Sequence, residues 1–251
     1  MEELATQAFW IGLAKIIGVN IVLSGDNAVV IALAARSLPP KQQKLAILWG
    51  AGAAVVLRII LTIFAVALLA LPWLKIVGSL LLFWIGIKLL VPEDGGDDIS
   101  ASDNLMAAIK TILIADLVMS LDNVIAVAAA AGGSMTLLIL GLAISIPLVV
   151  FGATLLVTLM ERYPVIITIG AALIGMVAGE MLVTDPVALD WMKGIAGIQV
   201  EGGKPKLQGV NLEFAAGAIG AVIVVVWGLW LAKRQEAAAK TRSGEKADEK
   251  I

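Results

Sequence analysis

The chain contains neither cysteine nor histidine among its 251 residues. These absences exclude disulfide bonds, zinc sites built on thiolates and metal sites built on imidazole. Without either residue no activated nucleophile–base pair can be assembled, and no Gly-x4-Gly-Lys-Ser/Thr phosphate-binding loop is present. We therefore expect no enzymatic activity and no prosthetic group, and any bound metal must be held mainly by oxygen atoms.

Charged and aromatic residues are also scarce. They make up 15% and 5% of the chain, whereas 60% of residues are hydrophobic and the mean hydropathy is +1.00. This composition predicts an all-α polytopic membrane protein, with the lipid bilayer as its environment. A net charge of -2 offers no basic surface for nucleic acid. The Met-Glu-Glu start has no basic segment ahead of the first apolar run, so we expect no cleaved signal peptide.

Seven apolar segments are long enough to cross a bilayer, which takes roughly 20 residues. Proline and glycine mark the turns between several of them, at Pro39-Pro40, Pro72, Gly132-Gly133 and Pro164. Together the segments predict a single transmembrane domain over residues 1–232. They cover residues 9–34, 46–70, 73–91, 107–131, 136–159, 165–184 and 212–232.

The polar parts of the chain are two long connections and a tail. Residues 92–104 form an acidic loop, and residues 185–211 mix charges with glycine and proline. Trp191, Met192, Ile195 and Ile198 recur at helical spacing in the second connection, which predicts a helix at the membrane surface. The tail, residues 233–251, is predicted to be a solvated helix or disordered.

Lysine and arginine predict the orientation. With the amino terminus outside, twelve of the 18 basic residues fall in inside segments and four in outside segments, while Lys15 and Arg58 lie within spans. Because inside loops of membrane proteins are enriched in Lys and Arg, we expect the amino terminus outside and the carboxyl terminus inside. The 92–104 loop and the tail would then be cytoplasmic, and the 185–211 loop external.

One polar motif occurs twice. Ser24-Gly25-Asp26-Asn27 returns as Ser120-Leu121-Asp122-Asn123, and residues 16–35 aligned with 112–131 without a gap share eight identities in twenty. A carboxylate in a membrane span is costly, so one that recurs indicates a function.

The duplication predicts two repeats of three spans each, about residues 8–91 and 105–184, with the seventh helix outside the repeat. Three spans is an odd number, so the repeats enter the membrane from opposite sides. Inverted repeats of this kind are typical of secondary transporters, whose binding sites lie between the repeats near the midplane.

Within this plan Asp26 is expected near the depth of Asp116, and Asp122 near that of Asn20, because Asn20 and Asp26 are six residues apart, as are Asp116 and Asp122, on helices that run in opposite directions. We also expect Gly25 and the neighbouring Ser and Asn side chains to unwind the helix locally, which would free carbonyl groups and turn the side chains toward one ion.

The candidate site is a set of hard oxygen ligands, which suits Mn²⁺, Mg²⁺ or Ca²⁺. Each member has a plainer alternative, since a polar residue in a span can simply hydrogen-bond a neighbouring helix or, if long, reach the interface. Arg58 is a candidate counter-ion for one carboxylate, and Glu180 a partly hydrated end residue, a proton carrier or an ion-entry ligand. The predicted metal ligands are Asp26, Asp122, Asp116, Asn27, Asn123 and Asn20, and the coupling or counter-ion candidates are Glu180, Arg58, Ser24 and Ser120.

With these motifs, together with Gly86-Ile87-Lys88-Leu89-Leu90 and Ala178-Gly179-Glu180-Met181, the chain resembles the TerC family of integral membrane proteins and its short YjbE-like metal transport branch. The resemblance covers about residues 8–232. It implies a manganese exporter of the bacterial cytoplasmic membrane, with the family's acidic residues at Asp26 and Asp122. Candidate protein partners are a second copy of the chain or the secretion machinery.

Three functions follow as hypotheses. The first is export of Mn²⁺ as transported substrate, by alternating access with proton counter-transport. The second keeps the mechanism and changes the substrate to Ca²⁺ or another divalent cation. The third is a membrane scaffold that aids assembly or metallation of exported proteins, with the buried acids as structural contacts.

Overall fold

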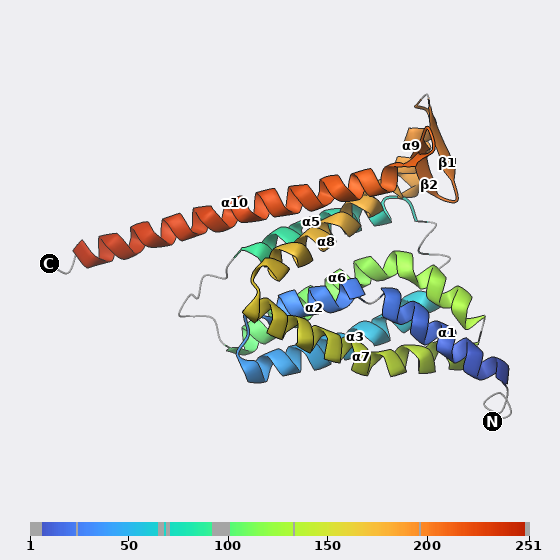
Figure 1. Ribbon diagram of the computed structural model, residues 1–251, viewed down its shortest axis with the longest axis horizontal. Coiled ribbons are helices and arrows are strands. Elements are labelled where there is room, and N and C mark those ends of the chain that lie inside the picture. Colours follow the sequence, from blue (N-terminus) through green and yellow to red (C-terminus); the bar gives the residue numbers. More distant parts are fainter. Residues whose placement is uncertain are drawn as a thin grey trace.

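The computed structural model describes residues 7–23, 25–64, 68, 71–91, 101–132, 134–195 and 197–248, apart from some side chains that include those of Asp122 and residues 239–248. The described chain is almost entirely helical, with one small sheet near its carboxyl-terminal third (Figure 1). The elements are α1 (Gln7–Leu23), α2 (Gly25–Ala35), α3 (Pro40–Ile63), α5 (Leu74–Leu90), α6 (Ala101–Ala131), α7 (Met135–Arg162), α8 (Val165–Val183), α9 (Pro186–Lys193), β1 (Ile198–Glu201), β2 (Lys204–Leu207), β3 (Val210–Asn211) and α10 (Leu212–Asp248).

The predicted class, a polytopic helical membrane protein, is confirmed. In the described part of the chain, five helices are long and apolar enough to cross a membrane, and α1 with α2 form a sixth such unit if their bent pair counts as one span. The predicted segment at 73–91 is the 17-residue helix α5. Proline and glycine begin several helices where the sequence predicts turns: Pro40 opens α3, Pro164 caps α8, and Gly132 (φ +56°) precedes α7.

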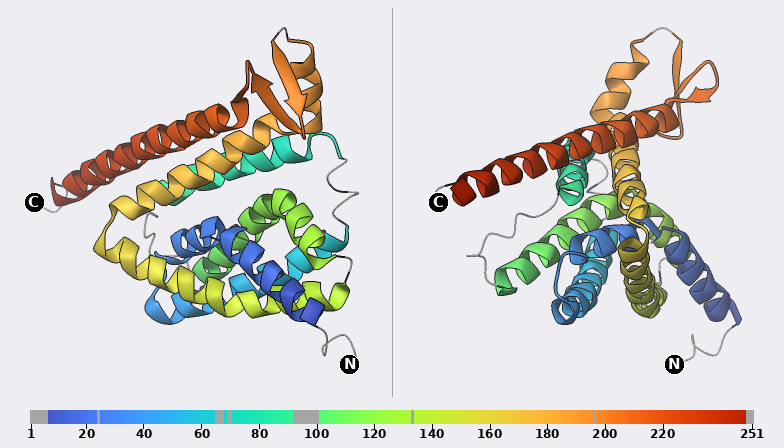
Figure 2. Two further views of the ribbon diagram at one scale, coloured as in Figure 1. Left: turned by 45° about the vertical axis from the view of Figure 1, so that its right-hand side comes forward. Right: turned by 60° about the vertical axis from the view of Figure 1, so that its left-hand side comes forward.

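The helices form two groups. Helices α5, α8 and α10 lie side by side, while α1, α2, α3, α6 and α7 pack into a second group (Figures 1 and 2). Contacts of α2 with α8 and of α6 with α5 join them. The two chain termini lie at opposite ends of the molecule (Figure 1).

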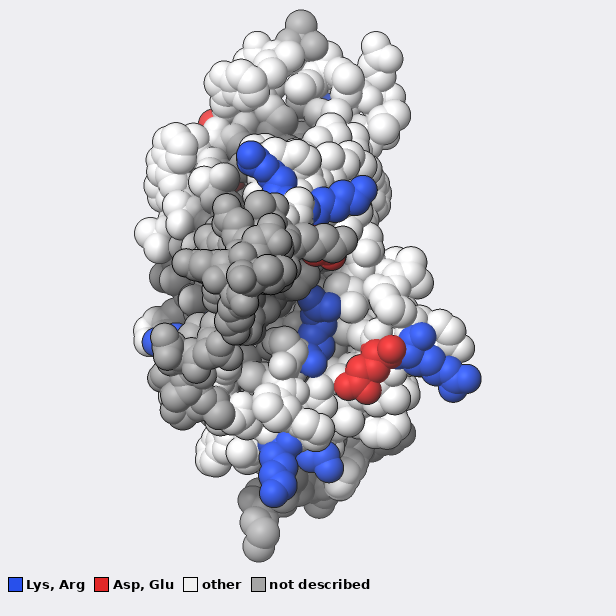
Figure 3. All heavy atoms as spheres, turned by 90° about the vertical axis from the view of Figure 1, so that its left-hand side faces the viewer, with Lys and Arg blue, Asp and Glu red and all other residues white. Residues whose placement is uncertain are grey.

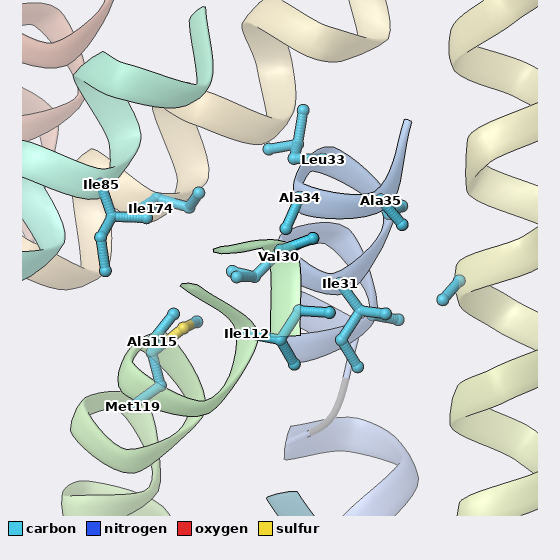
Figure 4. Packing of buried hydrophobic residues seen from close by; sticks show 14 of the residues in the cluster. Val30, Ile31, Leu33, Ala34, Ala35, Ile85, Ile112, Ala115, Met119 and Ile174 are labelled. Atoms are coloured by element: carbon cyan, nitrogen blue, oxygen red, sulfur yellow. The ribbon is translucent and has the colours of Figure 1, made fainter. Parts of the chain in front are cut away.

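The core between these groups is aliphatic. Val30 and Ile31 of α2 face Ile112 of α6, and Ile85 of α5 meets Ile174 of α8 (Figure 4). By contrast, all seven tryptophans of the chain are 49–73% exposed. A soluble protein would bury most of this aromatic surface, whereas a membrane protein places it against lipid and headgroups.

Small residues bring α8 and α10 into close contact. A methyl group on Gly175 would lie 2.5 Å from the carbonyl oxygen of Gly220, and one on Gly179 would collide with the carbonyl of Ala216. The stripe Ala171-x3-Gly175-x3-Gly179 therefore serves helix packing, as its spacing predicts. The seventh apolar segment is thereby fixed against α8 and, through Gly228 and Leu90, against α5.

The polar connections differ from the prediction. The surface helix predicted to extend through Ile198 is shorter than expected, because α9 ends at Lys193. After it, Gly194 and Gly197 (φ +89°) lead into an antiparallel sheet. Ile198 is opposite Leu207 in that sheet. Helix α6 already begins at Ala101, within the predicted 92–104 loop, whose residues 92–100 are outside the described residues. The tail is helical, since α10 continues to Asp248.

An exposed ion pair joins strands β1 and β2 of the sheet. The Lys206 ammonium lies 2.6 Å from the Glu201 carboxylate and holds the pKa of that carboxyl below its ordinary value.

Candidate cation site

The first motif lies at a break between two helices. Helix α1 ends at Leu23 and α2 begins at Gly25, with their axes bent by 49°; Ser24 is outside the described residues. The break leaves the last carbonyls of α1 and the first N–H groups of α2 without partners in their own helices. Asp26 lies in the first turn of α2, where a negative charge is favourable, and its Oδ1 accepts a hydrogen bond from the Asn27 N–H at 2.8 Å. The bend between α1 and α2 thus lies at the first motif, where the sequence predicts local unwinding.

The second motif does not interrupt its helix. Helix α6 runs from Ala101 to Ala131 through Ser120-Leu121-Asp122-Asn123. The sequence assigns local unwinding to Gly25, and the second motif, which has Leu121 at the equivalent position, stays helical. The physical reason is the residue after the serine, which is Gly25 in the first motif and Leu121 in the second; leucine favours helix where glycine disfavours it by roughly 1 kcal/mol.

A buried arginine connects the two motif helices. Arg58 of α3 donates from Nη1 to Asn20 Oδ1 of α1 at 2.9 Å, from Nη2 to Asp116 Oδ1 of α6 at 2.5 Å, and from Nε to Ser120 Oγ of α6 at 3.0 Å. Ser120 in turn donates to Asp116 Oδ2 at 3.2 Å. We call these four residues the Arg58 cluster. Asn20 and Asp116 occupy equivalent positions in the two aligned motif segments.

The cluster is sealed from solvent and lipid. Arg58 is 3% exposed, Asp116 4%, Asn20 1% and Ser120 0%. A guanidinium cannot lose its charge in a protein, and the Asp116 side chain is its buried acidic partner. In a medium of low dielectric constant, removing one member of such a pair typically costs 3–5 kcal/mol because the other charge is left buried and uncompensated.

Local sequence explains how the helices bring these groups together. Asp116 and Ser120 are four residues apart and so lie on one face of α6. Helix α3 approaches that helix closely because Gly50 has no side chain, and a methyl there would lie 2.8 Å from Ile112 Cδ1. Asn20 lies one turn before the end of α1, beside the helix break.

The remaining predicted residues are distributed around this cluster. Asp26 is half-buried in the first turn of α2. The Arg58 guanidinium joins Asn20 to Asp116, which the sequence places at different depths. Asn27 is buried and Asn123 half-buried.

Two predictions cannot be placed in the cluster. The side chain of Asp122 is outside the described residues, and among the residues described no group of three acidic side chains could hold a metal ion. Glu180 is half-buried against α10, where a methyl on Gly217 would lie 3.1 Å from Glu180 Oε1. That contact puts Glu180 at the α8–α10 interface.

Two hollows lie next to the cluster. One is lined by Asn20, by Gly25 and Ala28 beyond the helix break, and by Ser145 of α7. The other lies where α6 ends and α7 begins, and Thr62 lines it. Thr62 is one helical turn from Arg58 and donates to the Arg58 carbonyl at 2.7 Å. Both hollows therefore reach residues within or next to the cluster.

One buried acid has a structural role that the sequence reading did not assign. The Asp185 carboxylate accepts hydrogen bonds from Val187 N at 2.8 Å, Lys75 N at 3.1 Å and Trp73 N at 3.3 Å. It therefore caps α9 and α5 together. The sequence carries a signal for α9, since Asp before Pro186 is typical of a helix start. No local signal reports the contact with α5, which lies 110 residues earlier in the chain.

Comparison with known proteins matches residues 5–236 to the integral membrane protein TerC family. The chain belongs to this family. It is 44% identical over 177 residues to the uncharacterized membrane protein YjbE of Bacillus subtilis, a match that covers 70% of this chain and 81% of YjbE. It is 26% identical to YceF of the same organism, over 72% of this chain and 74% of YceF. The resemblance to TerC proteins seen in the motifs is therefore confirmed.

A more distant relative is YkoY of B. subtilis, 25% identical over 68% of this chain and 59% of YkoY. The names of these relatives describe membrane proteins and give no substrate. No solved structure matches the chain. The TerC family match thus supports a multi-pass membrane protein, and the chemistry has to be argued from the Arg58 cluster.

Proposed function

We propose that this TerC protein is a secondary transporter that exports a divalent cation, Mn²⁺ being the substrate we favour, across the bacterial cytoplasmic membrane. The observation that carries the proposal is the buried Arg58 cation, held by oxygen atoms from both motif helices. An interior that stabilises one permanent cation with hard oxygen atoms has the charge and the ligand type that a divalent cation requires.

The proposed architecture is two inverted three-helix repeats and one additional helix, seven spans in all. Its support is a reciprocal packing pattern. Helix α1 packs on α7 while its counterpart α6 packs on α3, and α2 contacts α8 while α6 contacts α5. Swapping the two repeats turns the pair α3–α7 into itself and the pair α5–α8 into itself, and the helices of both pairs are in contact. A site between such repeats, at a discontinuous helix, is typical of alternating-access transporters.

The proposed ligands surround the Arg58 cluster. Asp26 and Asp116 contribute carboxylates from the two motif helices, and Asp122 is the third proposed acid. Amide oxygens of Asn20, Asn27 and Asn123 and the last carbonyls of α1 complete a set made of oxygen alone. Such a set accepts Mn²⁺, Mg²⁺ or Ca²⁺, so the choice of Mn²⁺ rests on the resemblance to the YjbE-like branch, and Ca²⁺ is the alternative substrate.

The proposed orientation places the amino terminus outside. Several Lys and Arg side chains lie on the described part of the face shown in Figure 3. This is the cytoplasmic face in the proposal. A divalent cation leaving a negative-inside cell moves uphill by roughly 2.3 kcal/mol per charge per 100 mV, so export needs a coupled ion. We propose protons, carried inward by the site carboxylates.

A scaffold function is the second candidate, because the Arg58–Asp116 pair also joins α3 to α6 and could serve only to hold the bundle together. The two functions differ in what the acids do when the protein is folded.

The test is metal flux into proteoliposomes loaded with a metal-sensitive dye. We expect Asp26→Asn and Asp122→Asn to lower Mn²⁺ flux at least tenfold, which corresponds to about 1.4 kcal/mol of lost stabilisation. Asp116→Asn should lower it as well. Asp190→Asn, which changes an exposed acid on α9, is the matched control and should leave flux unchanged.

Unchanged flux in folded Asp26→Asn and Asp122→Asn proteins would contradict the transport site and favour the scaffold. Equal rates for Mn²⁺ and Ca²⁺ would contradict the selectivity. A flux that does not respond to an imposed pH gradient would contradict proton coupling.

A further inference from the structure

Arg58 occupies the position in which a transported cation would be expected. Three of its hydrogen bonds end on Asn20 Oδ1, Asp116 Oδ1 and Ser120 Oγ. A carboxylate, an amide oxygen and a hydroxyl are also the groups that a divalent cation takes as ligands. The guanidinium carries donors only, so it uses these oxygen atoms as a metal ion would use them.

The guanidinium and a metal ion therefore compete. Asn20 and Asp116 cannot direct the same oxygen lone pairs at both, and two cations a few ångströms apart repel strongly where water is excluded. Ser120 adds to the competition, since its hydroxyl accepts from Arg58 and donates to Asp116. Binding of the ion requires Arg58 to leave these ligands, and release of the ion allows it to return.

The replacement of the metal ion by Arg58 matters most after the protein has released its metal. A carrier that has released its ion must change conformation with its carboxylates inside the membrane, and uncompensated buried charge makes such a state costly. A cation tethered to α3 compensates Asp116 and removes part of that cost, while Asp26 and Asp122 are left to carry the proposed protons.

We propose that Arg58 is a tethered substitute for the transported cation, which compensates Asp116 in the metal-free site and permits the metal-free carrier to return with its protons. Arg58 is thus a positioning residue that governs one half of the cycle and is not a metal ligand. The proposal rests on the transport function proposed above.

The test compares two fluxes in the same proteoliposomes. Net flux of Mn²⁺ requires return of the empty site, whereas exchange of labelled for unlabelled Mn²⁺ across the membrane requires only the loaded form. We expect Arg58→Gln to lower net flux at least tenfold and to keep exchange within threefold of the wild type. Arg58→Lys keeps the charge without the planar fork, so its net flux should lie between the two.

A fall of both fluxes by the same factor in folded Arg58→Gln protein would overturn the proposal, because a merely structural residue affects both equally. Unchanged net flux would overturn it too. If Arg58→Gln does not fold, Arg58→Lys decides: a larger loss of net flux than of exchange supports the proposal, and equal losses overturn it.

The same assay separates this proposal from the function on which it rests. Asp116→Asn should lower net flux and exchange together, because it removes a ligand of the loaded form. If the wild-type protein shows neither flux, the transport function and this inference are both wrong. If the wild-type fluxes are normal and Arg58→Gln lowers net flux and exchange equally, only this inference is wrong.

Discussion

At the scale of single residues, two buried carboxylates illustrate different uses of the same group. Asp116 neutralises a buried guanidinium between α3 and α6. Asp185 accepts only backbone N–H groups, from the starts of α5 and α9. One of its donors is Trp73, which has a left-handed backbone (φ 69°) that non-glycine residues rarely adopt. Asp185 therefore stabilises a turn as well as two helix ends.

We predict that Asp185→Ala lowers the free energy of unfolding by about 2 kcal/mol, since two N-caps are lost at roughly 1 kcal/mol each. Thermal unfolding of the purified protein in detergent measures the change. Asp190→Ala is the control, because its pair with Lys193 at 2.6 Å is exposed and such pairs contribute at most about 1 kcal/mol. Equal stability of the two variants would contradict the capping role.

At the scale of helices, glycine decides which elements can touch. Helices α8 and α10 approach until backbone meets backbone, at Gly175 against Gly220 and Gly179 against Ala216. At such contacts the close packing that glycine permits offsets its low helix propensity. By contrast, nothing lies within 4 Å of the position that a methyl would take on Gly18 of α1. Identical residues in two apolar helices thus have different roles.

We predict that Gly179→Ala destabilises the protein by about 1–3 kcal/mol, as overpacking of a tight contact does. Gly18→Ala has no such contact and should be neutral or stabilising by up to about 1 kcal/mol, because alanine favours helix. Unfolding midpoints of the two variants, compared with the wild type in the same detergent, provide the measurement. A destabilised Gly18→Ala together with a neutral Gly179→Ala would reverse this assignment.

At the scale of the whole molecule, charge and aromatic residues are arranged for a bilayer. Basic side chains gather at one end of the helices, the sheet β1–β2–β3 lies toward the other end, and the tryptophans face outward (Figures 1 and 3). Helix α10 begins beside the sheet and runs to the opposite end of the molecule (Figure 1). The orientation proposed above therefore predicts that α10 begins outside the cell and ends inside it.

The absence of cysteine makes that statement testable. We predict that Val210→Cys, at an exposed position in β3, reacts with a membrane-impermeant maleimide in intact cells, whereas Lys233→Cys reacts only after permeabilisation. The unmodified chain is the control and should not be labelled. The opposite pattern would reverse the orientation, and labelling of both positions from one side would contradict a spanning α10.

The sequence alone determined the class of protein, the positions of its apolar helices, the turns at Pro40 and Pro164, and the TerC family. These features depend on composition and on local patterns, which a chain carries wherever its neighbours lie. The duplicated motif likewise directed attention to Asp26 and Asp122, and the inverted arrangement to Asp116. Gly25 in the first motif, where the second has Leu121, was the local signal for a bend.

The tertiary structure decided which residues meet. Arg58 pairs with Asp116 and binds Asn20 and Ser120, Asp185 caps α5, and Glu180 faces α10. All of these contacts depend on how closely the helices approach one another and on how each helix is rotated about its axis. Those quantities are set by side-chain volumes at distant contacts, such as Gly50 against Ile112, and no local pattern contains them. The ligands of a buried charge are chosen by packing, which is why the sequence could propose the charges but only the fold could pair them.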